Sequence, residues 1–348
     1  MAYTDIDKPS DYFNTKLYTG NASTQAITGI NFQSDMVWTK ARSGTYGTQD
    51  HAIIDVVRGV TKTIRPNETT TEGTETNTIT SFDTDGYTIG GDNGKFNQSS
   101  TEYASWNWKA NGAGSANTEG SESATVSVNT TAGFSIVKFV NVTTATANTF
   151  GHGLSVAPKV IIMRSLDSAY NWDVYHHKIA ISKRLILNSN SAESSSTYMN
   201  STSPTNEVFT VKSDEFANND DCIAYCFNDV QGYSKFGSYT GNGNADGPFC
   251  FTGFKPAFVL TKTASAAYHW SINDNKRNTF NPNDKRLYPS TNGVEATADA
   301  YDIDFLSNGF KIRSSSVSFN ASGDNVIYMA FAENPFVTGA SAIPTTAR

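Results

Sequence analysis

Hydrophobic and polar side chains alternate along several short stretches of the chain. In residues 102–109, Ala104, Trp106 and Trp108 face one side and the intervening residues face the other. A period of two with aromatic residues on one face is typical of a half-buried β-strand. Between two other predicted strands, Gly86 supplies the positive φ that a tight turn needs. Further hydrophobic runs predict strands over residues 36–41, 52–57, 78–82, 87–89, 134–140 and 159–164.

The pattern of one such stretch occurs three times. Three segments align without a gap, each with a hydrophobic run in the middle and a cation at its end: residues 32–40, 156–164 and 254–262. In each copy a lysine then precedes a glutamate by ten residues: Lys62 and Glu72, Lys183 and Glu193, Lys285 and Glu295. A third landmark is a phenylalanine that lies eleven or twelve residues before another aromatic residue: Phe96, Phe216 and Phe319. A unit of about a hundred residues is too long for a solenoid, so the repetition predicts related domains in tandem.

The repeats divide the chain into five predicted parts. The stretch 111–122 is assigned to a linker because it is small, polar and rich in glycine, with nothing that could join a core. The Ser- and Asn-rich stretch 188–206 is expected to be a long exposed loop. A circular, pseudo-threefold arrangement of the repeats is the alternative to a linear one. The predicted parts are a first repeat with an N-terminal extension (1–110), the linker (111–122), a second repeat (123–230), a third repeat (231–336) and a polar tail (337–348).

Composition sets the fold class. Aromatic residues make up 12% of the chain, with 21 Phe and 16 Tyr, while leucine is scarce and Thr, Ser, Asn and Gly are abundant. Aromatic and β-branched residues fit a pleated surface, and Asn, Ser and Gly favour turns over helix. We therefore predict an all-β protein of three tandem, related β-sandwich modules, with a jelly roll as one candidate topology.

Charge and cysteine content exclude several classes of function. The net charge is −7, and no basic face that could bind nucleic acid is visible in the sequence. Neither a secretory signal nor an apolar run long enough for a membrane span is present, so membrane insertion is not expected. The three cysteines lie in apolar runs and are interpreted as small buried residues: Cys222, Cys226 and Cys250.

Several side chains could carry chemistry, and each has a simpler explanation. The three Lys/Glu pairs could form a threefold ligand site, but structural ion pairs across hairpins are favoured, since an apolar residue follows each lysine at the second position. Trp172 and Trp270 occupy matching points of repeats two and three, where repeat one has His51. Both tryptophans are interpreted as core residues; the alternative is that they are exposed and stack on a sugar ring. His176 and His177 form the one histidine cluster, which no other repeat matches.

No catalytic or metal site is predicted, and no cofactor. The turn at residues 83–86 has a calcium-like Asp-x-Asp-Gly pattern but lacks the remainder of an EF-hand loop. Nucleophile elbows, P-loops, zincin helices and dinucleotide fingerprints are all missing. A glycosidase needs only two carboxylates, for which Asp274, Asp302 and Asp304 could be named, but nothing singles them out.

The three-part pattern resembles a family of repeated β modules in virion proteins of tailed bacteriophages, especially phages of marine bacteria. The stretches that carry the resemblance are residues 3–12, 17–21, 37–42, 55–59, 81–87, 103–110 and 328–336. The resemblance implies a tail fibre or another virion structural component, outside enzymology. Repeat two departs most from the pattern, because it lacks the turn glycine and carries the insertion 188–206.

The resulting expectation is a non-enzymatic virion structural protein on the surface of a phage particle, assembled in the host cytoplasm. A tail fibre or appendage that contacts the host surface is favoured; a capsid decoration or head fibre protein and a polysaccharide depolymerase are the alternatives. Its partners would be other virion proteins, a bacterial surface glycan or protein receptor, and further copies of itself, with a trimer favoured. Binding is expected in loops that differ between repeats (44–50, 188–206 and 273–284), with Tyr46, Tyr170, His176, His177 and Tyr268 as candidate surface-binding residues.

Overall fold

The computed structural model describes residues 3–44, 46–143, 145–297, 302–338 and 344–346. Helix within these residues is limited to a 3-10 turn, η1 (Pro9–Asp11), and one short helix, α1 (Val317–Asn320). Antiparallel strands form the rest of the regular structure. The predicted all-β fold class is therefore confirmed.

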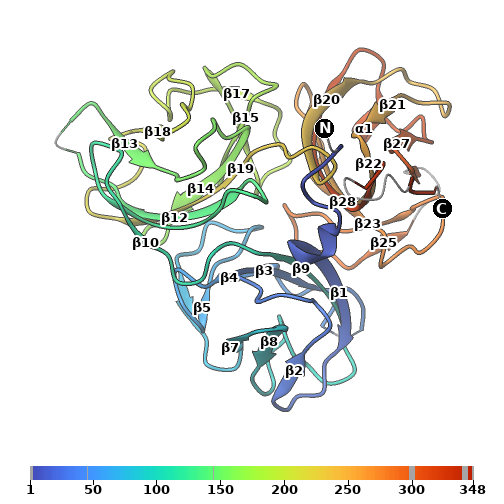
Figure 1. Cartoon of the computed structure of the whole chain (residues 1–348), viewed down its shortest axis with the longest axis horizontal. Coiled ribbons are helices and arrows are strands. Elements are labelled where there is room, and N and C mark those ends of the chain that lie inside the picture. Colours follow the sequence, from blue (N-terminus) through green and yellow to red (C-terminus); the bar gives the residue numbers. More distant parts are fainter. Residues whose placement is uncertain (1–2, 45, 144, 298–301, 339–343, 347–348) are drawn as a thin grey trace.

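The strands group into three lobes (Figure 1). Each lobe contains one large sheet, and the four main strands of that sheet are arranged in the same order. In the first lobe the order is β1 (Phe13–Thr19), β9 (Glu102–Trp108), β3 (Met36–Ala41) and β4 (Ala52–Asp55). In the second lobe it is β12 (Phe134–Val140), β19 (Asp221–Phe227), β14 (Val160–Ser165) and β15 (Asp173–His176). In the third lobe it is β20 (Ser234–Thr240), β28 (Asn325–Pro335), β22 (Phe254–Thr263) and β23 (Ser271–Asp274).

A smaller sheet packs against each large sheet, so each lobe is a sandwich with its own apolar layer. The small sheets are formed by β2 (Gln25–Ile27), β8 (Gly86–Ile89) and β7 (Ile79–Asp83); by β13 (Ala147–Gly151) and β18 (Val208–Lys212); and by β21 (Phe249–Phe251), β27 (Gly309–Ile312) and β26 (Ile303–Leu306). Short strand pairs complete the lobes: β5 (Lys62–Thr63) with β6 (Gly73–Thr74), β16 (Lys183–Ile186) with β17 (Ser194–Ser195), and β24 (Lys285–Arg286) with β25 (Ala296–Thr297).

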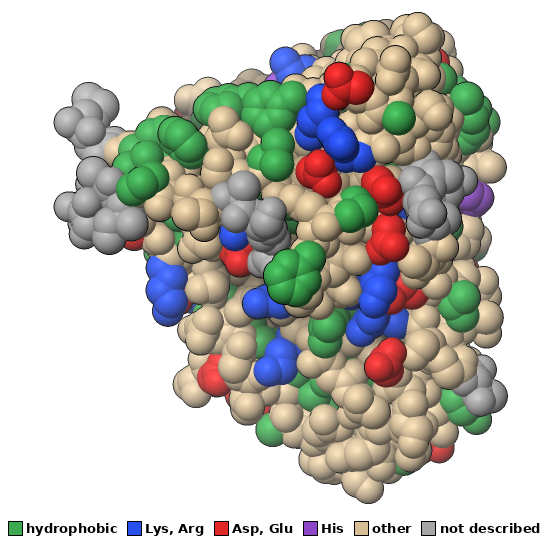
Figure 2. Space-filling model, turned by 90° about the vertical axis from the view of Figure 1, so that its right-hand side faces the viewer, with side chains coloured by type: hydrophobic (Ala, Val, Ile, Leu, Met, Phe, Trp, Pro, Cys, Tyr) green, Lys and Arg blue, Asp and Glu red, His purple; other side chains and the backbone are tan. Residues whose placement is uncertain are grey.

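The outer surface carries both signs of charge side by side. On the face shown in Figure 2, Lys and Arg side chains lie next to Asp and Glu side chains in a band across the molecule. Such mixing produces no broad field of one sign, in keeping with a protein of modest net charge.

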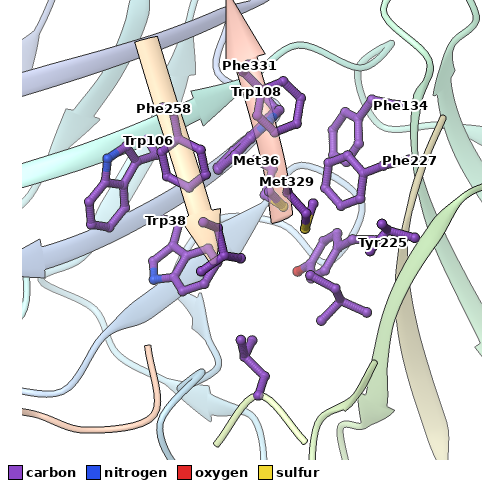
Figure 3. Close-up of a cluster of buried hydrophobic side chains, with 14 of the residues drawn as sticks. Met36, Trp38, Trp106, Trp108, Phe134, Tyr225, Phe227, Phe258, Met329 and Phe331 are labelled. Carbon is purple, nitrogen blue, oxygen red and sulfur yellow. The ribbon is translucent and has the colours of Figure 1, made fainter. Parts of the chain in front are cut away.

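The lobes share a hydrophobic core at the centre of the molecule. The cluster contains side chains from all three large sheets, among them Trp38, Trp106, Phe227, Phe258 and Phe331 (Figure 3). The ring centroids of Trp108 and Phe227 lie 6.4 Å apart, and those of Trp108 and Phe331 lie 5.7 Å apart, so the three lobes meet directly. Three independent domains in series would have no such common core.

The shared core corrects one expectation about β9. Its alternation predicted a half-buried strand, but residues 103–108 are all buried. Ala104, Trp106 and Trp108 face the shared core, and the opposite face lies beneath the small sheet of the first lobe. A sheet between two apolar layers needs no solvent face.

The stretch 111–122 is not simply a linker. Residues 115–117 form β10, which pairs antiparallel with β11 (Ala124–Asn129) at the edge of the large sheet of the second lobe. Pairing at a sheet edge uses only backbone N–H and C=O groups, so polar composition did not reveal it. Gly120 approaches this lobe so closely that a Cβ there would lie 2.1 Å from the carbonyl oxygen of Thr149.

The polar stretch 188–206 is only partly an exposed loop. It contains β17, and Tyr198 and Met199 are buried in the core of the second lobe. Of the predicted tail, residues 339–343 and 347–348 lie outside the described residues, while Val337 forms an isolated bridge with Pro344.

Candidate functional site

The two histidines predicted as surface-binding residues lie between the second and third lobes. His176 is completely buried, and its Nε2 lies 3.3 Å from the carbonyl oxygen of Tyr328. His177 is half-buried, with Nε2 2.9 Å from the carbonyl oxygen of Phe236. Burial lowers the pKa of His176 to about 3, so its ring is neutral at physiological pH. The surface role predicted for His176 is therefore wrong, and His177 joins two lobes.

The predicted core role of Trp172 and Trp270 is confirmed. Both are buried, and each indole donates to a backbone carbonyl of the preceding lobe: Trp172 to Arg65 at 2.8 Å and Trp270 to Ile186 at 2.9 Å. His51 completes the circle, with Nε2 3.1 Å from the carbonyl oxygen of Tyr288 in the third lobe. These three rings are buried at the joints, by which we mean the interfaces between neighbouring lobes. Their faces are therefore not exposed for stacking on a sugar.

The repeated glutamates also mark the joints. Their backbone amides donate to carbonyl groups of the next lobe in cyclic order: Glu72 to Leu166, Glu193 to Ala264 and Glu295 to Arg42, at 2.8, 2.7 and 3.0 Å. Two of the predicted ion pairs form: in Lys62–Glu72 and in Lys183–Glu193 the lysine Nζ lies 3.4 Å from a carboxylate oxygen. Because both pairs are partly exposed, each contributes about 0–1 kcal/mol to the stability of the fold.

The third predicted pair, Lys285 with Glu295, is replaced by a different contact. Glu295 accepts two hydrogen bonds from Arg42 of the first lobe, at 2.9 and 3.0 Å, and lies 3.3 Å from Arg277. Guanidinium groups bind a carboxylate in bidentate fashion, which a lysine cannot do. The pair therefore forms across a joint between lobes and not across a hairpin.

A buried carboxylate strengthens two of the three joints. Asp55 accepts a hydrogen bond from the hydroxyl of Tyr225 in the second lobe at 2.7 Å, and Arg58 lies 2.5 Å away. At the joint between the first and third lobes, Asp274 accepts from the indole of Trp106 at 3.1 Å. At the remaining joint the equivalent position, the last residue of β15, is occupied by His176, as the sheet register shows.

The cation at the end of each aligned segment is buried and bound by backbone carbonyls. Lys40 donates to the carbonyls of Ala41 and Gly47, and Lys262 donates to three carbonyls, one of them from Asn190 in the second lobe. Arg164 binds the carbonyls of residues 68 and 69 in the first lobe. Desolvation lowers the pKa of Lys40 to about 7 and that of Lys262 to about 8.

A pocket of about 300 Å³ opens in the third lobe, between strands β22 and β23 and helix α1. We call it the third-lobe pocket. The predicted candidate Tyr268 lines the pocket, while the predicted candidate Tyr46 lies elsewhere on the surface. The ring of Tyr170 packs against that of Phe216, with 5.6 Å between the ring centroids. The lining of the pocket consists of Thr261, Lys262, Thr263, Tyr268, His269, Ser271, Arg286, Tyr288, Ser316, Val317, Ser318 and Phe319.

Rings and cations meet in this pocket. The guanidinium of Arg286 lies 5.2 Å from the centre of the Tyr288 ring, and the ring of His269 lies 5.5 Å from the same ring. The Nδ1 atom of His269 lies 2.8 Å from the hydroxyl of Ser290. Burial and the nearby Lys262 lower the pKa of His269. A pocket with a few convergent polar groups and aromatic walls is the common form of a ligand site.

Further acidic and sulfur-containing side chains in the described part of the chain lie in structural contacts. No group of three or more His, Cys, Asp or Glu side chains is arranged there to hold a metal ion. Asp274 is paired with Arg277 and Asp304 with Arg313, while Cys222, Cys226 and Cys250 are buried thiols whose pKa values burial raises. Among the same residues, no helix is long and apolar enough to cross a membrane.

The fold and the pocket define an all-β protein of three sandwich lobes around a common core, with a polar pocket in the third lobe. A family model described as "Domain of unknown function (DUF7483)" matches residues 8–335, and the chain belongs to this family. The match runs through all three lobes. Comparisons with curated proteins and with solved structures give no match.

Proposed function

We propose that the protein is a non-enzymatic structural component of a bacteriophage virion, carried as a tail fibre or similar appendage that contacts the host surface. The observation that best supports this proposal is the closed arrangement of the lobes, which holds the surface loops on one rigid body. The resemblance of the repeated stretches to phage virion modules supplies the biological setting.

The polar surface loops suit the presentation of binding groups. Strands anchored on both faces by apolar layers keep the intervening turns fixed, which reduces the entropy lost on binding. Other virion proteins are the proposed partners at the attachment end, and a bacterial surface glycan or protein receptor at the other. A homotrimer would raise avidity through simultaneous contacts.

The position of the protein in intact particles tests the proposal. Gold-labelled antibodies against the purified chain should bind the tail in electron micrographs, and its copy number should follow the threefold or sixfold symmetry of the tail. A copy number that follows the capsid lattice would instead establish a decoration protein. Normal adsorption to cells by particles that lack the protein would exclude the host-contact role.

Two solution measurements address the remaining parts of the proposal. Light scattering after gel filtration should give three times the chain mass of 37.7 kDa if the trimer is correct. Incubation with host capsule or lipopolysaccharide should release no reducing ends, and their release would show a depolymerase.

A further inference from the structure

Two histidines interrupt the threefold pattern of the joints. By sheet register, His51 stands where the second and third lobes have tryptophan, and His176 stands where the first and third lobes have aspartate. His51 lies at the joint between the first and third lobes, and His176 at the joint between the second and third. At the joint between the first and second lobes these two places are held by Trp172 and Asp55. The third lobe therefore has a histidine at both of its joints.

The partners of His51 fix its ring in one neutral form. Its Nδ1 atom accepts a hydrogen bond from the indole N–H of Trp38 at 3.0 Å, and its Nε2 atom lies 3.1 Å from the carbonyl oxygen of Tyr288. Because an indole nitrogen only donates and a carbonyl only accepts, the single ring proton is on Nε2. The ring is completely buried.

The ring of His176 is held in the same way. Its Nδ1 atom accepts from the backbone N–H of Lys178 at 3.2 Å, and its Nε2 atom faces the carbonyl oxygen of Tyr328. In both rings Nδ1 is thus bound within its own lobe, and the proton on Nε2 makes the contact across the joint. His177 adds a second contact across this joint, to the carbonyl oxygen of Phe236.

Neither buried ring has room for a second proton. An imidazolium carries a proton on both nitrogens, so Nδ1 would point an N–H group at a partner that can only donate. The charged groups that act on His51 are Lys40 of the first lobe and Arg277 of the third, and both are cations. Burial and these two charges hold the pKa of His51 well below its usual range.

The charges around His176 are mixed. His177 and Lys178 oppose a positive charge on the ring, and Asp229 favours one. Asp229 is itself paired with two lysines: Lys159 and Lys235. Burial and the neighbouring His177 therefore keep the pKa of His176 at about 3. Burial also lowers the pKa of His177, on which Lys178, Lys159 and Asp229 act.

We propose that the two joints of the third lobe are acid-sensitive: uptake of a proton by His51 and by His176 opens these joints, while the joint between the first and second lobes stays closed. Opening exposes both ring nitrogens to water, where the ordinary pKa of about 6.5 applies. The open joint then binds a proton that the closed joint excludes. Opening also uncovers the apolar face through which Phe258 and Phe331 enter the shared core.

Proton linkage gives the direction and size of the effect. The stability that these rings contribute to the closed joints is complete above about pH 7.5 and is lost as the pH falls through 6.5. Below that value each proton gained raises the population of the open joint about tenfold per pH unit, or about thirtyfold between pH 7.5 and pH 5. Carboxylates with ordinary pKa values near 4 remain charged in this range. The effect concerns the purified chain and does not rest on the proposed function.

Backbone amides at the joints report each opening separately. The amide of Glu193 donates across the joint of the second and third lobes, that of Glu295 across the joint of the third and first, and that of Glu72 across the joint of the first and second. Hydrogen exchange of the full chain at pH 7.5 and pH 5, corrected for intrinsic exchange rates, gives a protection factor for each amide. The factors of Glu193 and Glu295 should fall at least about thirtyfold, and that of Glu72 less than about threefold. An equal fall at all three amides, or no fall at Glu193 and Glu295, would contradict the proposal.

Glutamine substitutions identify the sites of proton uptake, because an amide keeps a donor and an acceptor but does not titrate. His51→Gln should remove most of the loss of protection at Glu295 and leave that at Glu193, and His176→Gln should reduce the loss at Glu193 alone. Each variant is compared with itself at the two pH values, so a lower overall stability does not affect the result. Losses in both variants equal to those of the wild type would refute the assignment.

His152→Gln is the matched control. His152 is a buried ring with the same bonds, from the backbone N–H of Leu154 to Nδ1 and from Nε2 to the carbonyl oxygen of Thr205, but it lies within the second lobe. This substitution should leave the losses at Glu193 and Glu295 unchanged. If it removes them as well, the acid sensitivity comes from buried histidines in general and not from the joints.

NMR of the wild-type chain labelled with nitrogen-15 histidine tests the proposal without any substitution. In the closed form, His51 and His176 should keep their single proton on Nε2 down to pH 5. Titration of both rings near pH 6.5, while Glu193 and Glu295 remain protected, would overturn the proposal.

Discussion

At the residue scale, the joints between lobes depend on buried polar atoms that each have a defined partner. Tyr225, Asp55 and Arg58 form one such group, in which the carboxylate accepts from both a hydroxyl and a guanidinium. Because these atoms are removed from water, each missing partner leaves the others unsatisfied. The sequence could not reveal this group, since Tyr225 and Asp55 are 170 residues apart.

The substitution Tyr225→Phe should destabilise the protein by about 1.5–3 kcal/mol, because it removes only the hydroxyl that binds a buried carboxylate. Urea unfolding of wild type and variant measures the difference. Tyr198→Phe is the matched control: that hydroxyl is buried without a hydrogen-bond partner, so its removal relieves a desolvation cost and should raise stability by about 1 kcal/mol. Equal effects of the two substitutions would contradict the described role of Asp55.

Buried lysines make stability depend on pH in an unusual direction. Burial lowers the pKa of Lys40 to about 7, whereas in the unfolded chain it returns to about 10.4. Between these values the unfolded state binds more protons, so the contribution of Lys40 to stability rises with pH. This contribution is lost as the pH falls through 7.

The comparison of wild type with Lys40→Met isolates that contribution. From pH 7 to pH 9 the free energy of unfolding of the wild type should gain about 2 kcal/mol relative to the variant. Other titrating groups, including the buried cysteines, are common to both proteins and cancel in the difference. Parallel pH profiles would show that Lys40 keeps an ordinary pKa in the folded state.

At the element scale, hydrophobic pattern located the central strands well and the edge strands poorly. The prediction for β3 over residues 36–41 agrees with the structure, and that for β9 differs by one residue at its end. Strand β10 was missed because only its backbone pairs with the sheet. The periodicity of hydrophobic side chains reflects their burial. It therefore cannot predict a strand that is held in the sheet by main-chain hydrogen bonds alone.

The same limit applies to the third-lobe pocket. Tyr268 could be named from its position near a loop that differs between repeats, but Arg286 and Ser318 could not. These two residues reach the pocket from β24 and α1, which only the tertiary fold brings together. A repeat alignment that compared residues position by position would have shown Ser271 and Ser318 where the second lobe carries Asp173 and Glu215.

The hairpin β7–β8 allows a test of why its turn carries glycine. Gly86 has φ +98°, as the sequence predicted, and a Cβ there would lie 2.0 Å from the carbonyl oxygen of Ile27. Gly59 has a similar φ of +95° but open space around it. Gly59→Ala should therefore cost about 1–2 kcal/mol from backbone strain alone, and Gly86→Ala about 2 kcal/mol more.

Thermal or urea unfolding of the two alanine variants measures this difference. If both lose the same stability, the close approach of the two segments at Ile27 contributes nothing, and the conformation of the turn alone explains the glycine.

At the scale of the whole molecule, the shared core makes the lobes dependent on one another. In the second lobe, Ile136, Ile162 and Tyr225 belong to the shared core and not to the core between its own two sheets. An isolated lobe would expose this apolar face to water, and patches beyond a few hundred Å² are rare on soluble monomers. The sequence repetition suggested separable domains, because internal similarity says nothing about the surfaces through which copies meet.

We therefore expect the intact chain to unfold in one transition, with coincident curves from far-UV and near-UV circular dichroism. A fragment of residues 123–230 should lack a cooperative thermal transition. A fragment that melts cooperatively near the temperature of the intact chain would show that the second lobe is an independent domain.

The contact between Tyr3 and Phe336 has a mechanical consequence. Tyr3 donates its hydroxyl to the carbonyl of Gly253 at 2.6 Å, and its ring centroid lies 6.3 Å from that of Phe336, so these two residues from opposite parts of the sequence lie together beside the third lobe (Figure 1). Any tether attached beside these two residues would therefore apply its force at the third lobe. Because the three lobes share one core, tension along such a tether would pass from the third lobe through the joints into the other two.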